Sequence, residues 1–103
     1  MMSELYELLK ELKIPIAYHH FGKSTSPPFI TYYRANSQNF VADDSVYKKI
    51  DVFRIELYTK QKDIAKEIEL ENLLDRSGNI YEVISENYIE SEKIYQVVYE
   101  LDI

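Results

Sequence analysis

The sequence predicts an α+β fold: a single domain, residues 1–103, in which a mainly antiparallel sheet is flanked by two helices. Three observations lead to this prediction. Two segments carry leucine and isoleucine at helical spacing, five segments are rich in β-branched and aromatic residues, and most connections are short. The predicted element order is α-β-β-β-α-β-β, and 103 residues suffice for one hydrophobic core.

The first helix is predicted over residues 3–13, where an apolar stripe recurs at helical spacing. The stripe consists of Leu5, Leu8, Leu9 and Leu12. Ser3 is expected to cap the start of this helix, and Pro15 prevents its continuation.

The first three strands are predicted over residues 16–21, 29–35 and 46–59. The turn-forming stretch GKSTSPP separates the first two, and residues 36–44 are expected to be irregular. The run VYKKIDVFRIELYT contains neither glycine nor proline and exceeds the usual strand of about 5–6 residues. We therefore expect part of it to extend beyond the compact sheet.

The second helix is predicted over residues 64–76, with Asp63 as its N-cap and Gly78 as a left-handed stop. It carries two apolar patches on opposite sides. One patch contains Leu70, Leu73 and Leu74, and the other contains Ile64, Ala65 and Ile68. Since a helix that covers a sheet needs one patch, the second is expected to meet either the first helix or another subunit.

The last third predicts a β-hairpin, IYEVISENYIE and IYQVVYELDI joined by SEK. Its second strand alternates cleanly between apolar and polar residues. The apolar positions are Tyr95, Val97, Tyr99, Leu101 and Ile103.

Two adjacent histidines, His19 and His20, are the first candidates for chemistry. Neighbouring side chains on a strand point to opposite faces, so the pair is not expected to hold one metal ion. The chain has no cysteine and no GxSxG motif, so a histidine has no evident nucleophile to activate. We expect a structural role for both, with no catalytic residue, metal or cofactor.

The even-numbered glutamates of the hairpin would share one face of a straight strand. They are Glu82, Glu86, Glu90 and Glu92. Residues four apart on a strand are about 13 Å apart, too far to share an ion. This face is either simply solvated or forms an acidic lining that repels phosphate and lets DNA pass.

Composition argues against nucleic-acid binding as the main activity. The net charge is −6 and no dense basic patch is visible. No apolar run is long enough to span a membrane. The ten tyrosines suit either interfaces or half-exposed strand faces, and both interpretations stay open.

An assembly surface is therefore the remaining prediction. Phe40 and Val41 lie in a polar segment, where they either fold back onto the core or anchor a partner. A free strand edge can pair with a neighbour, and head-to-tail contacts close into rings. The predicted subunit contacts are Phe40, Val41, Tyr47, Val52, Tyr58, Ile64 and Ile68.

The succession of PIAYHHF, PPFITYY, FVADDSVYKKIDVFRIELYT, an acidic helix and YIESEKIYQVVYEL resembles small tail-completion proteins of long-tailed phages. These tail terminator or tail-to-head joining proteins occur in phages and prophages of Gram-positive bacteria. The resemblance covers nearly the whole chain and rests on strand patterns, without a chemical signature.

The resemblance implies a non-enzymatic structural protein that forms a ring of about six subunits. The ring would cap the tail tube, meet other tail or connector proteins, and let DNA pass without sequence-specific or membrane binding. The expected location is the virion tail or head–tail junction, and the bacterial cytoplasm before assembly. The alternative is a small cytosolic protein-binding or regulatory module that recognises a peptide through a sheet edge.

Overall fold

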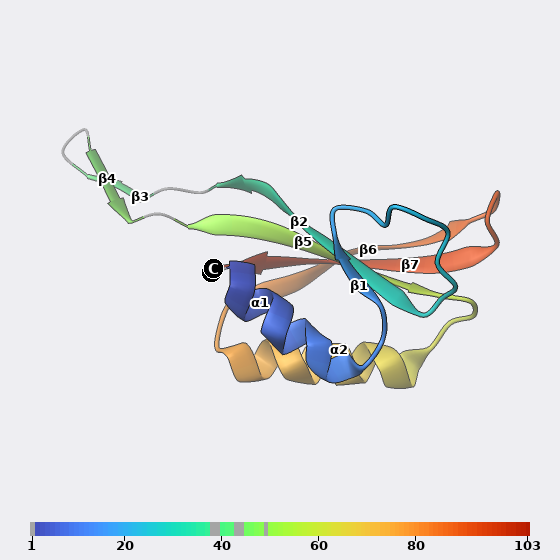
Figure 1. Cartoon of the computed structure of the whole chain (residues 1–103). Coiled ribbons are helices and arrows are strands. Elements are labelled where there is room, and N and C mark those ends of the chain that lie inside the picture. The colour runs from blue at the N-terminus through green and yellow to red at the C-terminus, as the bar shows by residue number, and fades with distance from the viewer. Residues whose placement is uncertain (1, 38–39, 43–44, 49) are drawn as a thin grey trace.

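The computed structural model describes residues 2–37, 40–42, 45–48 and 50–103, with side chains described for residues 4–37 and 50–103. Its main element is a five-stranded sheet of order β1-β2-β5-β7-β6 (Figure 1). The strands are β1 Ile16–Tyr18, β2 Phe29–Ser37, β5 Asp51–Thr59, β6 Tyr81–Ile89 and β7 Ile94–Asp102. The pairs β2–β5, β5–β7 and β6–β7 are antiparallel, whereas β1 runs parallel to β2. The predicted fold class and element order are confirmed.

Strand β5 lies at the centre of the sheet and shows the predicted alternation. Phe53, Ile55 and Leu57 are buried on one face, while Arg54 and Glu56 are half-buried on the other. Burial of one face fixes the register, because a slip by one residue would turn the apolar set outward.

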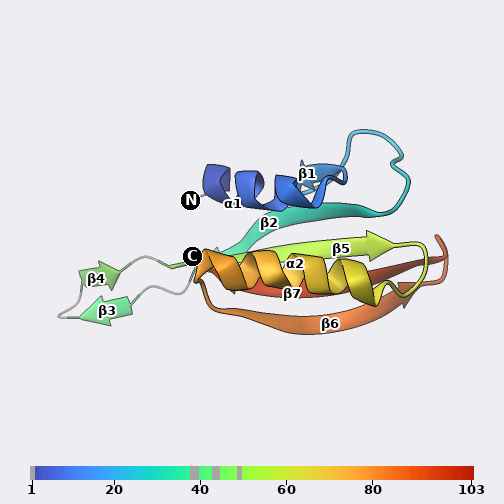
Figure 2. The ribbon, with the colours of Figure 1, turned by 90° about the horizontal axis from the view of Figure 1, so that it is seen from below.

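Two helices cover the apolar face of the sheet, and Figure 2 shows α2 lying over β5 and β7 while β6 runs along one margin. Helix α1, Met2–Leu9, continues as the 3-10 turn η1, Lys10–Leu12, and ends at Lys13 in the left-handed conformation. The described helix begins at Met2, so Ser3 lies within it and the expected cap at Ser3 is wrong.

Helix α2, Ile64–Ser77, has the predicted ends. The Asp63 carboxylate accepts a hydrogen bond from the Lys66 backbone N–H at 3.0 Å, and Gly78 has φ 78°. These caps satisfy backbone groups that a helix leaves without intrahelical partners. The buried core joins both helices to the sheet: Leu5, Leu9, Leu12, Ile30, Tyr32, Phe53, Ile55, Leu57, Leu70, Leu73, Leu74, Val97, Tyr99 and Leu101.

A two-stranded ribbon, β3 Phe40–Ala42 and β4 Ser45–Lys48, extends past the end of the main sheet (Figure 1). The molecule is accordingly elongated, measuring 50 × 27 × 23 Å. The expected single strand over residues 46–59 is divided into β4 and β5, so the prediction that part of it leaves the sheet is confirmed. The expected irregularity of residues 36–44 is wrong for β3 and for the end of β2, because β2 and β5 stay paired up to Ser37 and Asp51.

Candidate assembly surface

Strand β6 forms a long edge of the main sheet. Within the described residues it pairs with β7 and with no other strand, although it is nine residues long. An edge strand presents backbone N–H and C=O groups that another chain can bind, and soluble proteins protect such edges with charged residues (lysine above all), proline, β-bulges or a covering element. Of these devices, β6 has two glutamates and one bulge. The sequence of β6 contains neither lysine nor proline.

A β-bulge reorients the side chains of this edge. Val83 pairs with Tyr99 and Ser85 pairs with Val98, so Ile84 is the extra residue. An extra residue shifts the alternation of a strand, and side chains on either side of it change faces.

The bulge overturns the prediction of a single acidic face. Glu82 lies opposite Glu100 on the face without helices, whereas Glu86 lies on the helix-covered face and contacts Lys62. Glu90 and Glu92 lie in the turn between β6 and β7 rather than on a strand. The four glutamates therefore form no common lining.

The exposed large apolar side chains gather on β6 and α2. Six of the eight such side chains in the described part of the chain belong to α2, to β6 or to the residue just before β6. We call these six the β6–α2 apolar set: Ile64, Ile68, Ile80, Val83, Ile84 and Tyr88. Ile80 is 72% exposed and Ile64 is 61% exposed. Concentrated exposure of this kind marks an interaction site more often than scattered single residues do.

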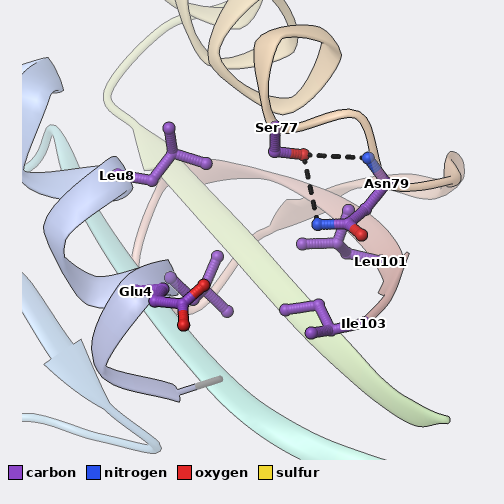
Figure 3. A pocket seen from close by; sticks show the side chains of 7 residues that line it. Glu4, Leu8, Ser77, Asn79, Leu101 and Ile103 are labelled. Carbon is purple, nitrogen blue, oxygen red and sulfur yellow. Dashed lines mark hydrogen bonds between the residues drawn. The ribbon is translucent and has the colours of Figure 1, made fainter.

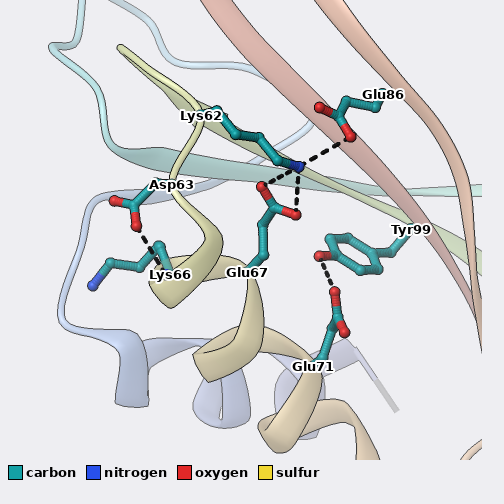
Figure 4. A network of polar contacts seen from close by, with 7 residues as sticks. All are labelled: Lys62, Asp63, Lys66, Glu67, Glu71, Glu86 and Tyr99. Carbon is teal, nitrogen blue, oxygen red and sulfur yellow. Dashed lines mark hydrogen bonds and ion pairs between the residues drawn. The ribbon is translucent and has the colours of Figure 1, made fainter.

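Charged groups fix α2 against β6 and β7 (Figure 4). The Lys62 ammonium group lies 2.8 Å from Glu67 and 3.0 Å from Glu86, which joins the start of α2 to β6. Hydrogen bonds to Glu67 and Glu86 raise the pKa of Lys62 above its ordinary value. The Tyr99 hydroxyl of β7 donates to Glu71 of α2 at 2.8 Å. Burial, followed by this hydrogen bond, raises the pKa of Tyr99 well above its ordinary value.

These contacts decide which way the second patch of α2 points. Glu67 and Glu71 face β6 and β7, and Arg76 on another flank of the helix pairs with Glu11 beside α1. Counting about 100° per residue around the helix, Ile64 and Ile68 lie next to Glu67 on the side away from the buried leucines. Both isoleucines are exposed. The alternative that this patch packs against the first helix is therefore wrong.

The remaining predicted contact residues have different places. Val52 is fully buried within the subunit, so its predicted role in subunit contact is corrected. Tyr58 is half-buried: its ring stacks on Phe29 with a centroid distance of 4.7 Å, and its hydroxyl accepts a hydrogen bond from Gln96 at 2.9 Å. The side chains of Phe40, Val41 and Tyr47 lie outside the described residues. The prediction missed Ile80, Val83, Ile84 and Tyr88, which look like ordinary hairpin residues until the strand order makes β6 an edge.

The two histidines do not lie on a strand as predicted, because β1 ends at Tyr18. His19 has φ 70°, which breaks the strand alternation and brings the two rings to the same side. Their Nδ1 atoms are 3.0 Å apart. The expectation that they point to opposite faces is therefore wrong.

A small hollow lies between one side of α1, from Glu4 to Leu8, and the C-terminal ends of α2 and β7 (Figure 3). Its volume of about 210 Å³ is below the roughly 300–1,000 Å³ of typical small-molecule sites. Leu8, Leu101 and Ile103 provide apolar lining, while Ser77 Oγ accepts hydrogen bonds from the backbone and side-chain nitrogens of Asn79. This hollow offers a ligand little room and few polar groups that are not engaged locally.

Among the described residues, no group of three or more histidine, cysteine, aspartate or glutamate side chains is arranged to hold a metal ion. The helices of the described chain include none with the length and apolar character needed to cross a membrane. The fold and its exposed groups define an α+β protein whose most distinctive feature is an apolar, unpaired strand edge.

Comparison with known proteins does not place the chain in a family: no family model matches it, and no match is found among curated proteins.

Proposed function

We propose that this protein is a non-enzymatic structural subunit of a phage or prophage tail or head–tail junction, and that it acts as a tail terminator or tail-to-head joining ring. The observation that carries the proposal is the free edge of β6 together with the β6–α2 apolar set. The resemblance of the strand segments to tail-completion proteins supplies the biological setting.

The β6 edge supports assembly because it exposes both unpaired backbone groups and apolar side chains. Its backbone groups can extend a sheet, and its apolar side chains gain free energy when they leave water. Glu82 gives the strand negative charge, which favours a partner surface carrying positive charge, whereas the charge of Glu86 is already paired with Lys62.

The β3–β4 ribbon supports the same proposal. An isolated two-stranded hairpin is at best marginally stable in water, and it gains stability when it packs on another surface. Figures 1 and 2 both show the ribbon reaching away from its own sheet, so a neighbouring subunit is the natural surface for it. A ribbon at one end and a free edge at the side are different surfaces, and contacts between different surfaces form rings or filaments.

The proposal is tested by producing the protein together with a phage tail-tube protein and imaging the products by negative-stain electron microscopy. We expect a ring at one end of each tube and an end to tube growth. Mass measurement by light scattering at high protein concentration gives the number of subunits, which the resemblance sets at about six.

Substitutions test whether ring formation depends on the β6–α2 apolar set. Val83→Lys and Ile68→Lys are expected to abolish ring formation, because each places a charge in the apolar set, while circular dichroism stays unchanged. Tyr6→Lys is the matched control, since Tyr6 is 39% exposed on α1 and lies away from β6. A protein that stays monomeric with tube protein present, and leaves tube growth unaffected, overturns the proposal.

The same edge would serve the alternative, a cytosolic module that binds a peptide by strand addition. Such a module would remain a monomer, bind a defined peptide, and lose that peptide in Ile84→Pro without any effect on tubes. Finding a gene for a major tail protein next to the gene of this chain would favour the tail assignment over this alternative.

A further inference from the structure

The segment after β1 holds a strained turn at the histidine pair. The His20 backbone N–H donates to the Tyr18 carbonyl at 2.8 Å, and the intervening His19 has φ 70°. A hydrogen bond across two residues with positive φ at the centre is a γ-turn of the rare, strained kind. The His19 backbone N–H donates to the Tyr32 carbonyl at 2.7 Å, which ties the turn to β2.

This turn places two imidazole rings against each other. The Nδ1 atoms of His19 and His20 share a hydrogen bond of 3.0 Å, so one ring carries its proton on Nδ1, and the rings are nearly perpendicular at 88°. The His19 ring also lies beside Tyr33 with a centroid distance of 5.5 Å, which restricts its position. A left-handed residue other than glycine costs free energy, and such strained residues concentrate at functional sites.

The separation of the two nitrogens matches a chelate. With metal–nitrogen bonds of about 2.0–2.1 Å, two nitrogens 3.0 Å apart subtend about 91–97° at the metal. That angle fits neighbouring positions of a tetragonal complex, the geometry of Cu²⁺ and Ni²⁺ with nitrogen ligands. Tetrahedral Zn²⁺ needs nitrogens about 3.3–3.4 Å apart at the same bond lengths. Chelation requires the ring that donates this hydrogen bond to move its proton to Nε2, which leaves both Nδ1 lone pairs free. Both histidines are exposed, so their rings have room to rotate toward one ion.

We propose that His19 and His20 form a two-histidine chelating site for Cu²⁺, with water in the remaining coordination positions. Copper is the first choice because it stands highest in affinity among the divalent first-row metals. The proposal is independent of the assembly function, and either can fail without the other.

The surroundings set the expected strength. The rings border a hollow of about 260 Å³ that is also lined by Phe21, Lys23 and Glu92. Among the described residues, no third histidine, cysteine, aspartate or glutamate joins the two histidines in a metal-binding group. The positive charge of Lys23, which lines the same hollow, disfavours a bound cation. Two imidazoles and water therefore predict weaker binding than that of a closed structural site with four protein ligands.

The test is a titration of the full chain with Cu²⁺ at pH 7.5 by isothermal calorimetry, with electron paramagnetic resonance of the bound ion. We expect one ion per chain and splitting from two nitrogens. His19→Gln and His20→Gln are each expected to weaken binding at least tenfold, because a chelate needs both rings.

A double variant tests whether binding requires two adjacent histidines or only two histidines in this segment. His20→Gln with Gly22→His keeps two histidines in the segment but removes their adjacency, and a Cβ at Gly22 meets nothing within 4 Å. We expect this variant to bind as weakly as the single variants. Tight binding by the double variant, binding unaffected by loss of either histidine, or two independent ions per chain would each overturn the proposal.

Discussion

The hydrogen bond between Tyr99 and Glu71 allows the contribution of one polar contact to be measured. Tyr99 is fully buried, and its hydroxyl lies 2.8 Å from a Glu71 carboxylate oxygen. Tyr99→Phe keeps the buried ring and removes this bond alone. A hydrogen bond to a charged acceptor contributes about 1.5–3 kcal/mol, so we expect the free energy of unfolding at pH 7 to fall by that amount. The melting temperature should fall by about 7–15 °C for a domain of this size.

The pKa of Tyr99 adds a pH dependence with a definite sign. Because burial raises that pKa in the folded state, the folded protein holds the phenol proton more tightly than the unfolded chain does. The resulting stability is fully present below the unfolded pKa of about 10 and is lost as the pH rises above it. At pH 11 the wild-type protein loses about 1.4 kcal/mol through this residue, and Tyr99→Phe does not.

Urea unfolding followed by circular dichroism at pH 7, 9 and 11 measures both effects. The difference between wild type and Tyr99→Phe should narrow by about 1.4 kcal/mol between pH 9 and pH 11. Tyr32, Tyr58 and Tyr81 also have raised pKa values, but they are common to both proteins and cancel in the difference. Tyr95→Phe, at a half-buried position on the same strand, controls for loss of a hydroxyl. A variant within 0.5 kcal/mol of wild type at pH 7, a threshold set at the usual spread of neutral substitutions, would refute the reasoning.

Two further substitutions test the packing and the end of α2. Leu70→Ala, at a fully buried position, should cost about 2–5 kcal/mol in urea unfolding, whereas Ile68→Ala on the exposed side should stay within about 0.5 kcal/mol; equal costs would contradict the assigned helix faces. Gly78→Ala should cost about 1 kcal/mol, because φ is 78° and open space around the added Cβ leaves backbone strain as the cause. Gly22→Ala is its control, since that glycine does not lie in the left-handed region, and it should be neutral or stabilising by up to about 1 kcal/mol. Equal losses for the two glycines would show that φ is not the cause.

The predictable part of the fold is local. Asp63 and Gly78 delimit α2 because a cap depends on hydrogen bonds and backbone angles within a few residues. The alternation of Phe53, Ile55 and Leu57 likewise predicts a half-buried strand, since successive side chains point to opposite faces.

The candidate site was predicted less well than the fold. Ile64 and Ile68 were recognised because they form a second patch on a helix that needs one. Val52 was misassigned because its burial depends on residues of other strands, and Val83 was missed because nothing in its own segment makes β6 an edge.

The sequence by itself determined the two helices, the five strands of the main sheet, the two apolar sides of α2 and the lack of cysteine chemistry, because these depend on residue type and on spacing along the chain. The tertiary structure decided which strand lies at the edge, where the bulge at Ile84 separates Glu82 from Glu86, and that His19 turns its ring toward His20. The strand order and the bulge arise from pairing between strands, which is set by packing and register rather than by local propensity. The histidine turn is local, but the hydrogen bond from the His19 N–H to the Tyr32 carbonyl of β2 ties it to the sheet.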